Sequence, residues 1–369
     1  MQPPSLLIGF LILGSIVLGI IFLGQPQPLA PDLDISNTLP KDNQNIETIA
    51  EGLTIPWEVT FLPNGEWLAT ERPGRLWRSG GDNSPITIEG VHYSGEGGLL
   101  GMALHPQFQT NGWIYLYYTS QNDGLIENQV SRYVFDGQQN RLTNAKTILG
   151  GIPGSANHHG GRIAFGPDGY LYITTGDAQQ SETAQDITSL AGKILRVDEN
   201  GNIPSDNPFG NQVYSFGHRN PQGLTWDAEG QLWSTEHGRS GLASGFDELN
   251  QIESGNNYGW PAIQGDETGE GFRNPIIHSG ATDTWAPAGM AFHQGKIYFA
   301  GLRGEALYEY DLVTHELKIH FKHRFGRLRA VVAQADALYL STSNLDGRGI
   351  PRVGDDRIIR INWSYFKDT

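Results

Sequence analysis

The 369-residue sequence contains no cysteine, which excludes disulfide bonds, thiolate metal sites and cysteine nucleophiles together. It is also poor in basic residues, because 25 Lys and Arg stand against 40 Asp and Glu, for a net charge of −15. Nucleic-acid binding needs a basic surface that neutralises phosphates, so this composition argues against it. The excess of carboxylates is compatible with bound cations such as calcium, which oxygen ligands hold.

The sequence also lacks any long amphipathic helical pattern, which disfavours α/β folds. Glycine is abundant instead, at 48 residues, and a unit of apolar strand, tight turn and aromatic strand recurs. The spacing of the copies is roughly 40–65 residues, and repeats of this length made of strands alone predict an all-β, six-bladed β-propeller. A pair of β-sandwiches and a parallel β-helix are the alternatives. The six copies begin at Val59, Met102, Ile163, Leu224, Met290 and Val331.

The segment from Leu6 to Leu23 is almost wholly apolar. At about 1.5 Å per residue it nearly spans a bilayer core of roughly 30 Å. We therefore interpret residues 1–24 as a signal peptide or a membrane anchor, and the lack of a preceding Lys or Arg favours the anchor. Either role implies export to the periplasm or another extracytoplasmic space, with membrane contact only through residues 6–23. Residues 25–45 are predicted to be a linker, and residues 46–369 the propeller domain.

Reactive side chains gather in the loops between the predicted strands. Sites on rigid scaffolds are usually built from such loops, so we expect these segments to converge on one pocket. Two adjacent histidines, His158 and His159, stand in one of them, and an imidazole with its ordinary pKa of about 6.5 accepts a proton near pH 7. The loops are SGEGG (94–98), NHHGG (157–161), GHRNPQG (217–223), TEHGRSG (235–241), TWAP (284–287), LRG (302–304) and GRLR (326–329).

Five longer motifs occur in a fixed order. They are GEGGLLGMALHPQF, NHHGGRIAFGPDGYLY, IPSDNPF, GHRNPQG, and TEHG followed by DELN and NYGWP. With them, the chain from about Ile49 to Ile361 resembles the soluble quinoprotein sugar dehydrogenases, which use pyrroloquinoline quinone (PQQ). One such motif is a weak signal, whereas five in register are specific. The resemblance implies a propeller that binds PQQ and Ca²⁺ and oxidises the anomeric hydroxyl of aldoses to lactones, with hydride transfer to the quinone.

The resemblance also assigns the chemistry to particular side chains. His158 matches the family's general base, which takes the hydroxyl proton of the sugar. Arg219 matches the arginine that stabilises the developing oxyanion of the quinone, a role suited to a planar and permanently charged group. The other matches are cofactor contacts: Asn220, Thr284, Arg303, Arg327 and Arg329. The three arginines among them would supply one guanidinium for each of the three carboxylates of PQQ.

Two predicted sugar contacts depart from the family pattern. Asn157 stands where the glucose enzymes carry Asp, and an amide can hydrogen-bond but cannot raise the basicity of the neighbouring His158. Glu96 stands where Gln is usual. Its carboxylate could accept a hydrogen bond from a sugar hydroxyl, or it could pair with an arginine such as Arg219. The second arrangement would compromise the site.

Calcium is implied by the resemblance at two places. Gly238 and Arg239 align with the backbone carbonyls that hold the catalytic ion, although the family usually has Gly-Pro there. Carbonyl ligands do not depend on the side chain, but a nearby guanidinium would weaken cation binding. Asp247, Glu248 and the Tyr258 carbonyl resemble parts of a second, structural site; alternatively, the two acids are ordinary carboxylates at a strand end.

Other titratable residues are interpreted as structural: His105, His237, His278, His293 and Lys193, with Asp177 and Asp186 as turn caps. Two rival functions stay open. A calcium-dependent, lactonase-type hydrolase would need several side-chain carboxylates around a channel metal. A non-enzymatic carbohydrate- or protein-binding propeller would not keep the three arginines Arg219, Arg327 and Arg329. In the favoured reading, electrons pass from the reduced cofactor to an acceptor that the sequence does not name.

Overall fold

The computed structural model describes residues 45–81, 84–240 and 244–367. The predicted signal peptide or anchor (1–24) and the linker up to residue 44 lie outside these residues. Among the helices that the structure does describe, none has the length and apolar character needed to span a bilayer.

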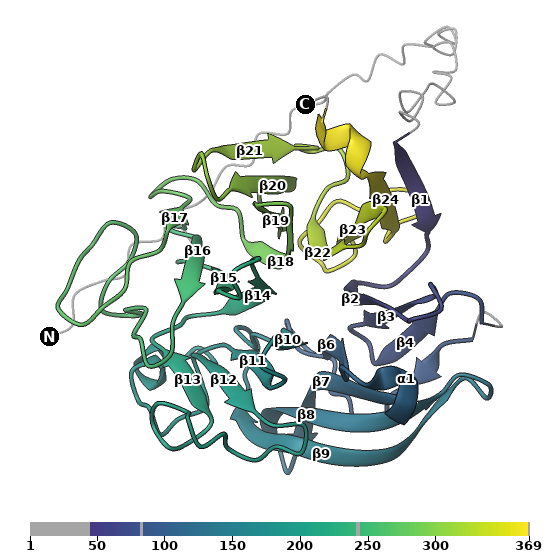
Figure 1. Cartoon of the computed structure of the whole chain (residues 1–369), viewed down its shortest axis with the longest axis horizontal. Coiled ribbons are helices and arrows are strands. Elements are labelled where there is room, and N and C mark those ends of the chain that lie inside the picture. The colour runs from purple at the N-terminus through teal and green to yellow at the C-terminus, as the bar shows by residue number, and fades with distance from the viewer. Residues whose placement is uncertain (1–44, 82–83, 241–243, 368–369) are drawn as a thin grey trace, which may run out of the picture. The chain divides into compact units, whose positions relative to one another are not determined.

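The described residues form six antiparallel sheets of four strands each, arranged around a common centre (Figure 1). This is the six-bladed propeller predicted from the repeats. The first three blades consist of β2 (Pro56–Phe61), β3 (Trp67–Glu71), β4 (Arg75–Arg78) and β5 (Ile86–Thr87); β6 (Leu99–Leu104), β7 (Trp113–Asn122), β8 (Leu125–Asp136) and β9 (Arg141–Pro153); and β10 (Ile163–Phe165), β11 (Leu171–Thr175), β12 (Lys193–Val197) and β13 (Val213–Phe216).

The remaining three blades follow the same order. They consist of β14 (Pro221–Trp226), β15 (Leu232–Glu236), β16 (Glu248–Ile252) and β17 (Ile277–His278); β18 (Pro287–His293), β19 (Lys296–Gly301), β20 (Ala306–Asp311) and β21 (Leu317–His320); and β22 (Leu328–Ala333), β23 (Ala337–Thr342), β24 (Ile358–Asn362) and β1 (Ile46–Ala50). Three short helical turns lie between or after the strands: α1 (Phe108–Asn111), η1 (Ser181–Ala184) and η2 (Trp363–Lys367).

The last blade is closed by the first strand of the chain, which the repeat pattern did not predict. Strand β1 pairs antiparallel with β24, so that Ile46 lies opposite Ile361. The buried carboxylate of Asp356 adds to this closure, because its oxygens accept hydrogen bonds from the backbone N–H groups of Ile55 (3.2 Å) and Asn344 (2.6 Å). Residues from both ends of the propeller therefore belong to one sheet.

The core lies between neighbouring blades. One cluster, for example, joins Trp57 of β2, Leu100 of β6, Tyr115 of β7 and Ile163 of β10, all with exposed fractions of 2% or less. A strand buried on both faces loses the apolar–polar alternation of a half-exposed strand, which is why β11 reads Leu-Tyr-Ile-Thr-Thr and is buried throughout. This packing gives the loops at the centre a rigid support.

The innermost strand of each blade decides where the site forms. In Figure 1 strands β2, β6, β10, β14, β18 and β22 surround the centre of the ring. Predicted site residues directly precede five of them, or lie at the start of the strand: Glu96 before β6, His158 before β10, Arg219 before β14, Thr284 before β18, and Arg327 and Arg329 at β22. The fold therefore brings together loops that are far apart in the sequence.

Lys193, at the start of β12, is fully buried and holds the loop before it. Its amine donates hydrogen bonds to the carbonyls of Thr183 (2.8 Å), Ala184 (3.0 Å) and Ala191 (2.5 Å). We expect Lys193→Met to lower the free energy of unfolding by about 3 kcal/mol, since the Ala191 carbonyl loses its donor and the carbonyls of Thr183 and Ala184 each lose one of two. Urea denaturation measures the change against Lys146→Met, which alters an exposed lysine of β9. Equal midpoints for the two variants would contradict this role.

Candidate active site

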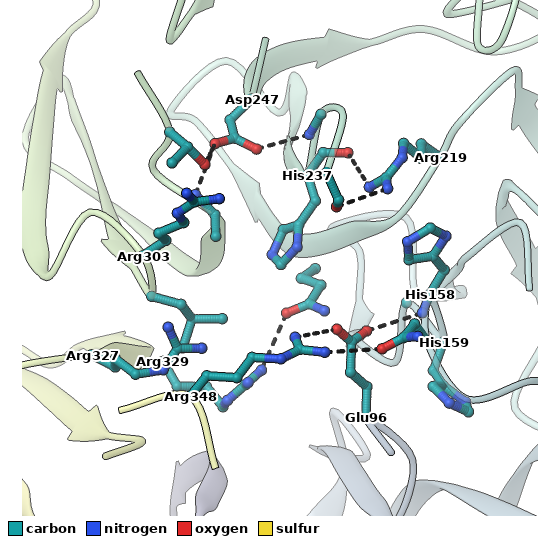
Figure 2. A pocket seen from close by; sticks show the side chains of 18 of the residues that line it. Glu96, His158, His159, Arg219, His237, Asp247, Arg303, Arg327, Arg329 and Arg348 are labelled. Atoms are coloured by element: carbon teal, nitrogen blue, oxygen red, sulfur yellow. Dashed lines mark hydrogen bonds and ion pairs between the residues drawn. The ribbon is translucent and has the colours of Figure 1, made fainter. Parts of the chain in front are cut away.

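Most of the predicted site residues line one cavity of about 420 Å³, which is within the range of small-molecule sites, about 300–1,000 Å³. Figure 2 shows their side chains around this cavity. The predicted residues in the lining are Glu96, Asn157, His158, Arg219, Gly238, Arg239, Asp247, Thr284, Arg303, Arg327 and Arg329. The structure therefore brings together residues from the loops of five blades.

His158 is held by a carboxylate that the sequence analysis interpreted as a turn cap. Its Nδ1 lies 2.7 Å from Asp177 Oδ1, and the other Asp177 oxygen accepts a hydrogen bond from Trp260 Nε1 at 2.9 Å. Asp177 also caps its turn, since the Gln179 N–H donates to it. A carboxylate at Nδ1 places the ring proton on that nitrogen and leaves Nε2 with its lone pair. His158 is thus arranged as a proton acceptor.

The carboxylate of Asp177 is suited to this task because it stays ionised. Burial by itself would raise its pKa, but the hydrogen bond and charge of His158, with the N–H donors of Gln179 and Trp260, lower it on balance. The side chain of Asp177 is almost fully buried, so the His158–Asp177 contact is shielded from water. No local pattern in the sequence indicated this pairing, since the two residues are 19 positions apart.

His159 has a structural role. It is buried, and burial lowers its pKa to about 4. Its Nδ1 bonds to the amide oxygen of Asn128 at 2.9 Å, and its backbone carbonyl accepts a hydrogen bond from the Tyr117 hydroxyl at 2.8 Å. The neutral ring packs the loop against the second blade. Of the two adjacent histidines, His158 is the one with a carboxylate partner.

Arg219, on the loop before β14, has no carboxylate partner for its guanidinium among the residues that the structure describes. Its guanidinium donates to Ser240 Oγ (3.0 Å) and lies 5.4 Å from the centre of the Trp260 ring. The carboxylate of Glu236 accepts the backbone N–H of Arg219 instead. Burial lowers the pKa of Arg219, which reflects the cost of keeping this charge away from water. A buried and unpaired guanidinium is prepared to receive an anion.

The three arginines predicted to bind carboxylates differ in how far they are already paired. Arg327 donates through Nε (2.9 Å) and Nη2 (2.8 Å) to the buried carboxylate of Asp346. Arg303 is exposed, and its guanidinium donates to the Ser244 hydroxyl at 2.9 Å. Arg327 is therefore already neutralised by Asp346, and its contact to a cofactor carboxylate stays a prediction.

Arg329 is a second buried guanidinium, besides Arg219, that forms no ion pair among the described residues. It donates to Ser343 Oγ (3.3 Å) and Gln222 Oε1 (3.2 Å), both neutral groups. Burial, together with the nearby charges of Arg72 and Arg327, lowers its pKa to about 9. Leaving such a charge without an anion is costly, so this position is suited to a negatively charged ligand.

Glu96 pairs with an arginine, but that arginine is Arg348 and not Arg219. Glu96 Oε1 accepts from Arg348 Nη1 at 2.5 Å, and Oε2 accepts from the backbone N–H of His158 at 3.0 Å. Asn157 Oδ1 accepts from Arg348 Nη2 at 2.9 Å. Both predicted sugar contacts therefore share one partner that the sequence analysis missed, on a loop of the last blade.

Asp247 connects two loops through four hydrogen bonds. Its Oδ1 accepts from the Gly238 N–H (2.8 Å), and its Oδ2 accepts from Thr284 Oγ1 (2.7 Å) and from the backbone N–H groups of Trp285 (2.6 Å) and Ala286 (2.9 Å). The hydroxyl of Thr284 is thus committed to Asp247. We conclude that Asp247 organises the cavity wall, in which Thr284 Oγ1 keeps its capacity to accept a hydrogen bond.

Glu248 and Tyr258 line a smaller, adjoining cavity that also contains Gly238 and Arg239. Glu248 lies opposite Glu236 in the β15–β16 pair. Burial, and then the charge of Glu236, raise the pKa of Glu248 to about 8. Two buried carboxylates side by side repel each other, so a cation between them would be stabilising.

Two residues lie differently from their sequence interpretation. Asn220 is buried outside the main cavity lining, where its amide oxygen accepts from the Gly160 N–H at 2.9 Å; it supports the histidine loop. His237, interpreted as structural, lines the main cavity. Its Nε2 is buried without a partner among the described residues, and burial lowers its pKa to about 4. Its place in the matched TEHG motif was the signal that could have identified it.

The comparisons with known proteins point to one family. The model of the glucose/sorbosone dehydrogenase family matches residues 53–353. The aldose sugar dehydrogenase YliI of Escherichia coli is 33% identical over 342 residues, which is 82% of this chain and 91% of that protein. An uncharacterised protein of Synechocystis is 38% identical over 246 residues, and this match spans 58% of each chain.

A solved structure agrees with these relatives. The PQQ-bound form of the aldose sugar dehydrogenase of Streptomyces coelicolor is similar with a TM-score of 0.80 and 40% sequence identity, over 86% of this chain and 97% of that one. The chain therefore belongs to the glucose/sorbosone dehydrogenase family, which confirms its resemblance to the soluble quinoprotein sugar dehydrogenases.

Proposed function

We propose that this protein is a PQQ-dependent aldose sugar dehydrogenase that oxidises the anomeric hydroxyl of an aldose to the lactone. The observation that carries the proposal is the pairing of two features in one cavity. One is a histidine whose Nδ1 is held by a buried carboxylate, His158 with Asp177. The other is Arg329, a buried guanidinium without a carboxylate partner in the described chain.

The cavity fits an anionic, planar cofactor. PQQ, when bound, would supply the acceptor for the hydride that leaves the sugar. Arg329 and Arg303 would hold its carboxylates, since neither has a carboxylate partner among the described residues. Arg219 would face the quinone oxygen, because its guanidinium is fixed by Trp260 and Ser240 and carries an uncompensated charge.

The chain's own part in the reaction is the proton. His158 Nε2 would take the proton of the anomeric hydroxyl, while Asp177 holds the ring orientation and stabilises the imidazolium that forms. Glu96 and Asn157 would contact the sugar hydroxyls from the side of Arg348. The buried Asp177 remains ionised throughout, so the proton stays on His158 until solvent or a second base removes it.

Calcium belongs to the proposal at two positions. The carbonyls of Gly238 and Arg239 are hard oxygen ligands at the cavity wall, and the Arg239 carbonyl keeps a free lone pair although it accepts the Gly245 N–H at 3.3 Å. A second ion fits beside Glu248 and the Tyr258 carbonyl, where it would relieve the repulsion from Glu236. We do not assign Asp247 to calcium, since its oxygens already accept four hydrogen bonds.

The rival functions fit less well. A lactonase-type hydrolase needs several side-chain carboxylates around one metal, and the described residues hold no cluster of three or more His, Asp or Glu that could bind one. A binding module would not require the buried His158–Asp177 pair. We further propose that residues 6–23 export the protein, as a cleaved signal or an anchor, and that an acceptor outside the cytoplasm receives the electrons.

Reconstitution tests this proposal. Protein treated with EDTA is titrated with PQQ, with and without Ca²⁺, and dye reduction is measured with a panel of aldoses. We expect sugar-dependent reduction that requires PQQ and that falls when Ca²⁺ is left out. Tight PQQ binding without reduction by any aldose would contradict the substrate class. Failure to bind PQQ at micromolar concentrations would contradict the cofactor and favour a binding propeller.

A further inference from the structure

A contact between distant loops closes the sugar side of the cavity. Arg348 stands in the loop between β23 and β24, in the last blade, 252 positions from Glu96 and 191 from Asn157. Its two terminal nitrogens reach one group each, the Glu96 carboxylate at 2.5 Å and the Asn157 amide oxygen at 2.9 Å. Figure 2 shows this guanidinium across the cavity from Arg219.

Glu96 is more buried than Arg348, so the charge of Glu96 depends on the ion pair more than the charge of Arg348 does. The Glu96 side chain is 17% exposed, whereas Arg348 is 57% exposed. A carboxylate in this position needs a counter-charge or a change of protonation. Burial alone would raise the pKa of Glu96, but Arg348 and the His158 N–H, with His237 adding a smaller effect, bring it down to about 2. Arg348 therefore keeps a buried carboxylate ionised.

The same carboxylate is connected to the proton acceptor. Glu96 Oε2 accepts the backbone N–H of His158, which has a positive φ of 63°. A non-glycine residue in this region of backbone space is held there by its surroundings. The His158 N–H is thus a second hydrogen-bond partner of Glu96, and it does not depend on Arg348, which binds the other carboxylate oxygen.

We propose that Arg348 is a positioning residue that determines which aldoses the cavity accepts, by fixing the Glu96 carboxylate and the Asn157 amide. The inference rests on the proposed function and adds its specificity determinant. Each carboxylate oxygen can accept more than one hydrogen bond, so Glu96 can receive a sugar hydroxyl while it is held by Arg348. The positions of these acceptors select among sugars that differ in the orientation of their hydroxyls, while the anomeric carbon stays with His158.

The test compares Arg348→Gln, Glu96→Gln and the double variant, with kcat and KM measured for several aldoses in the PQQ-loaded enzyme. We expect Arg348→Gln to raise KM by about tenfold or more, unequally among the sugars, and to leave kcat within about threefold. The double variant should be no worse than Glu96→Gln, because a neutral amide at position 96 needs no counter-charge. PQQ affinity, measured by absorbance titration, should be unchanged in all three.

Arg352→Gln is the matched control. It removes a guanidinium from the same loop that donates to the backbone carbonyls of Arg324 (2.6 Å) and His323 (3.1 Å), outside the cavity lining. Equal loss of kcat/KM for every sugar in Arg348→Gln, or strictly additive effects in the double variant, would overturn the inference. Wild-type enzyme that binds PQQ but oxidises no aldose would overturn the proposed function, and the inference with it.

Discussion

Replacing His158 by asparagine is expected to lower kcat for aldose oxidation by about 10³-fold, because the cavity then lacks the imidazole that a buried carboxylate holds as proton acceptor. Asparagine is the informative substitution, since it tolerates the positive φ of 63° at this position better than most residues. PQQ affinity should stay within about threefold, since His158 is not among the cations that would hold the cofactor. Single-turnover reduction of the bound cofactor by sugar measures the step directly.

Asp177→Asn provides the intermediate case. The amide can still bond to His158 Nδ1, but it does not stabilise the imidazolium and it can select the wrong tautomer. We expect a loss in kcat of about 10–100-fold, with sugar KM little changed. The pH profile distinguishes this role from a structural one, because the amide leaves the imidazolium form of the base without its counter-charge. A variant with wild-type kcat and pH profile would show that Asp177 is merely a turn cap.

The second large effect is expected at Arg329. Arg329→Met should weaken PQQ binding by about 100-fold or more, since truncating one partner of a buried charge pair costs about 2–5 kcal/mol. The stability of the cofactor-free protein should not fall, because the substitution removes a buried cation whose partners are neutral, Ser343 and Gln222. Loss of binding without loss of stability is the signature of a residue kept for its ligand.

Arg327→Met is the natural comparison, since the same side chain is truncated two positions earlier. Here the buried Asp346 loses its partner, so we expect the free energy of unfolding to fall by about 3 kcal/mol. Its effect on PQQ affinity should be smaller than that of Arg329→Met. If both variants behave alike in stability and binding, the distinction between a paired and an unpaired arginine is wrong.

The blades and the cavity loops were predictable from the sequence, because each depends on a pattern within one short segment. The six repeats gave the blades, and the loops before their innermost strands gave Glu96, His158, Arg219 and Arg329 as cavity residues. What sequence reasoning missed depends on contacts between segments far apart. The loop that carries Arg348 and the turn that carries Asp177 have no local sequence pattern that indicates which residue either side chain will contact.

Asn220 and Arg327 have partners that sequence reasoning did not predict. Both stand in motifs that match the family, and a match identifies the position but not the partner that a side chain finds in this chain. Asn220 bonds to the Gly160 backbone, and Arg327 is neutralised by Asp346, 19 positions away. Charge counts made along a sequence cannot anticipate such pairings, since they depend on how two loops of one blade fold back on each other.

The strand that closes the ring has a consequence for when the protein becomes active. Strand β1 pairs with β24, so the first and last elements of the propeller meet only after the whole domain has been synthesised. Contacts between such distant segments form slowly, because the entropy cost of closing the long loop comes before the stabilising contacts are made. The cavity also needs Arg348, which lies just before β24. A nascent chain that lacks β24 would therefore hold no finished site, and the proposed binding groups for PQQ would be complete only once this strand has been made.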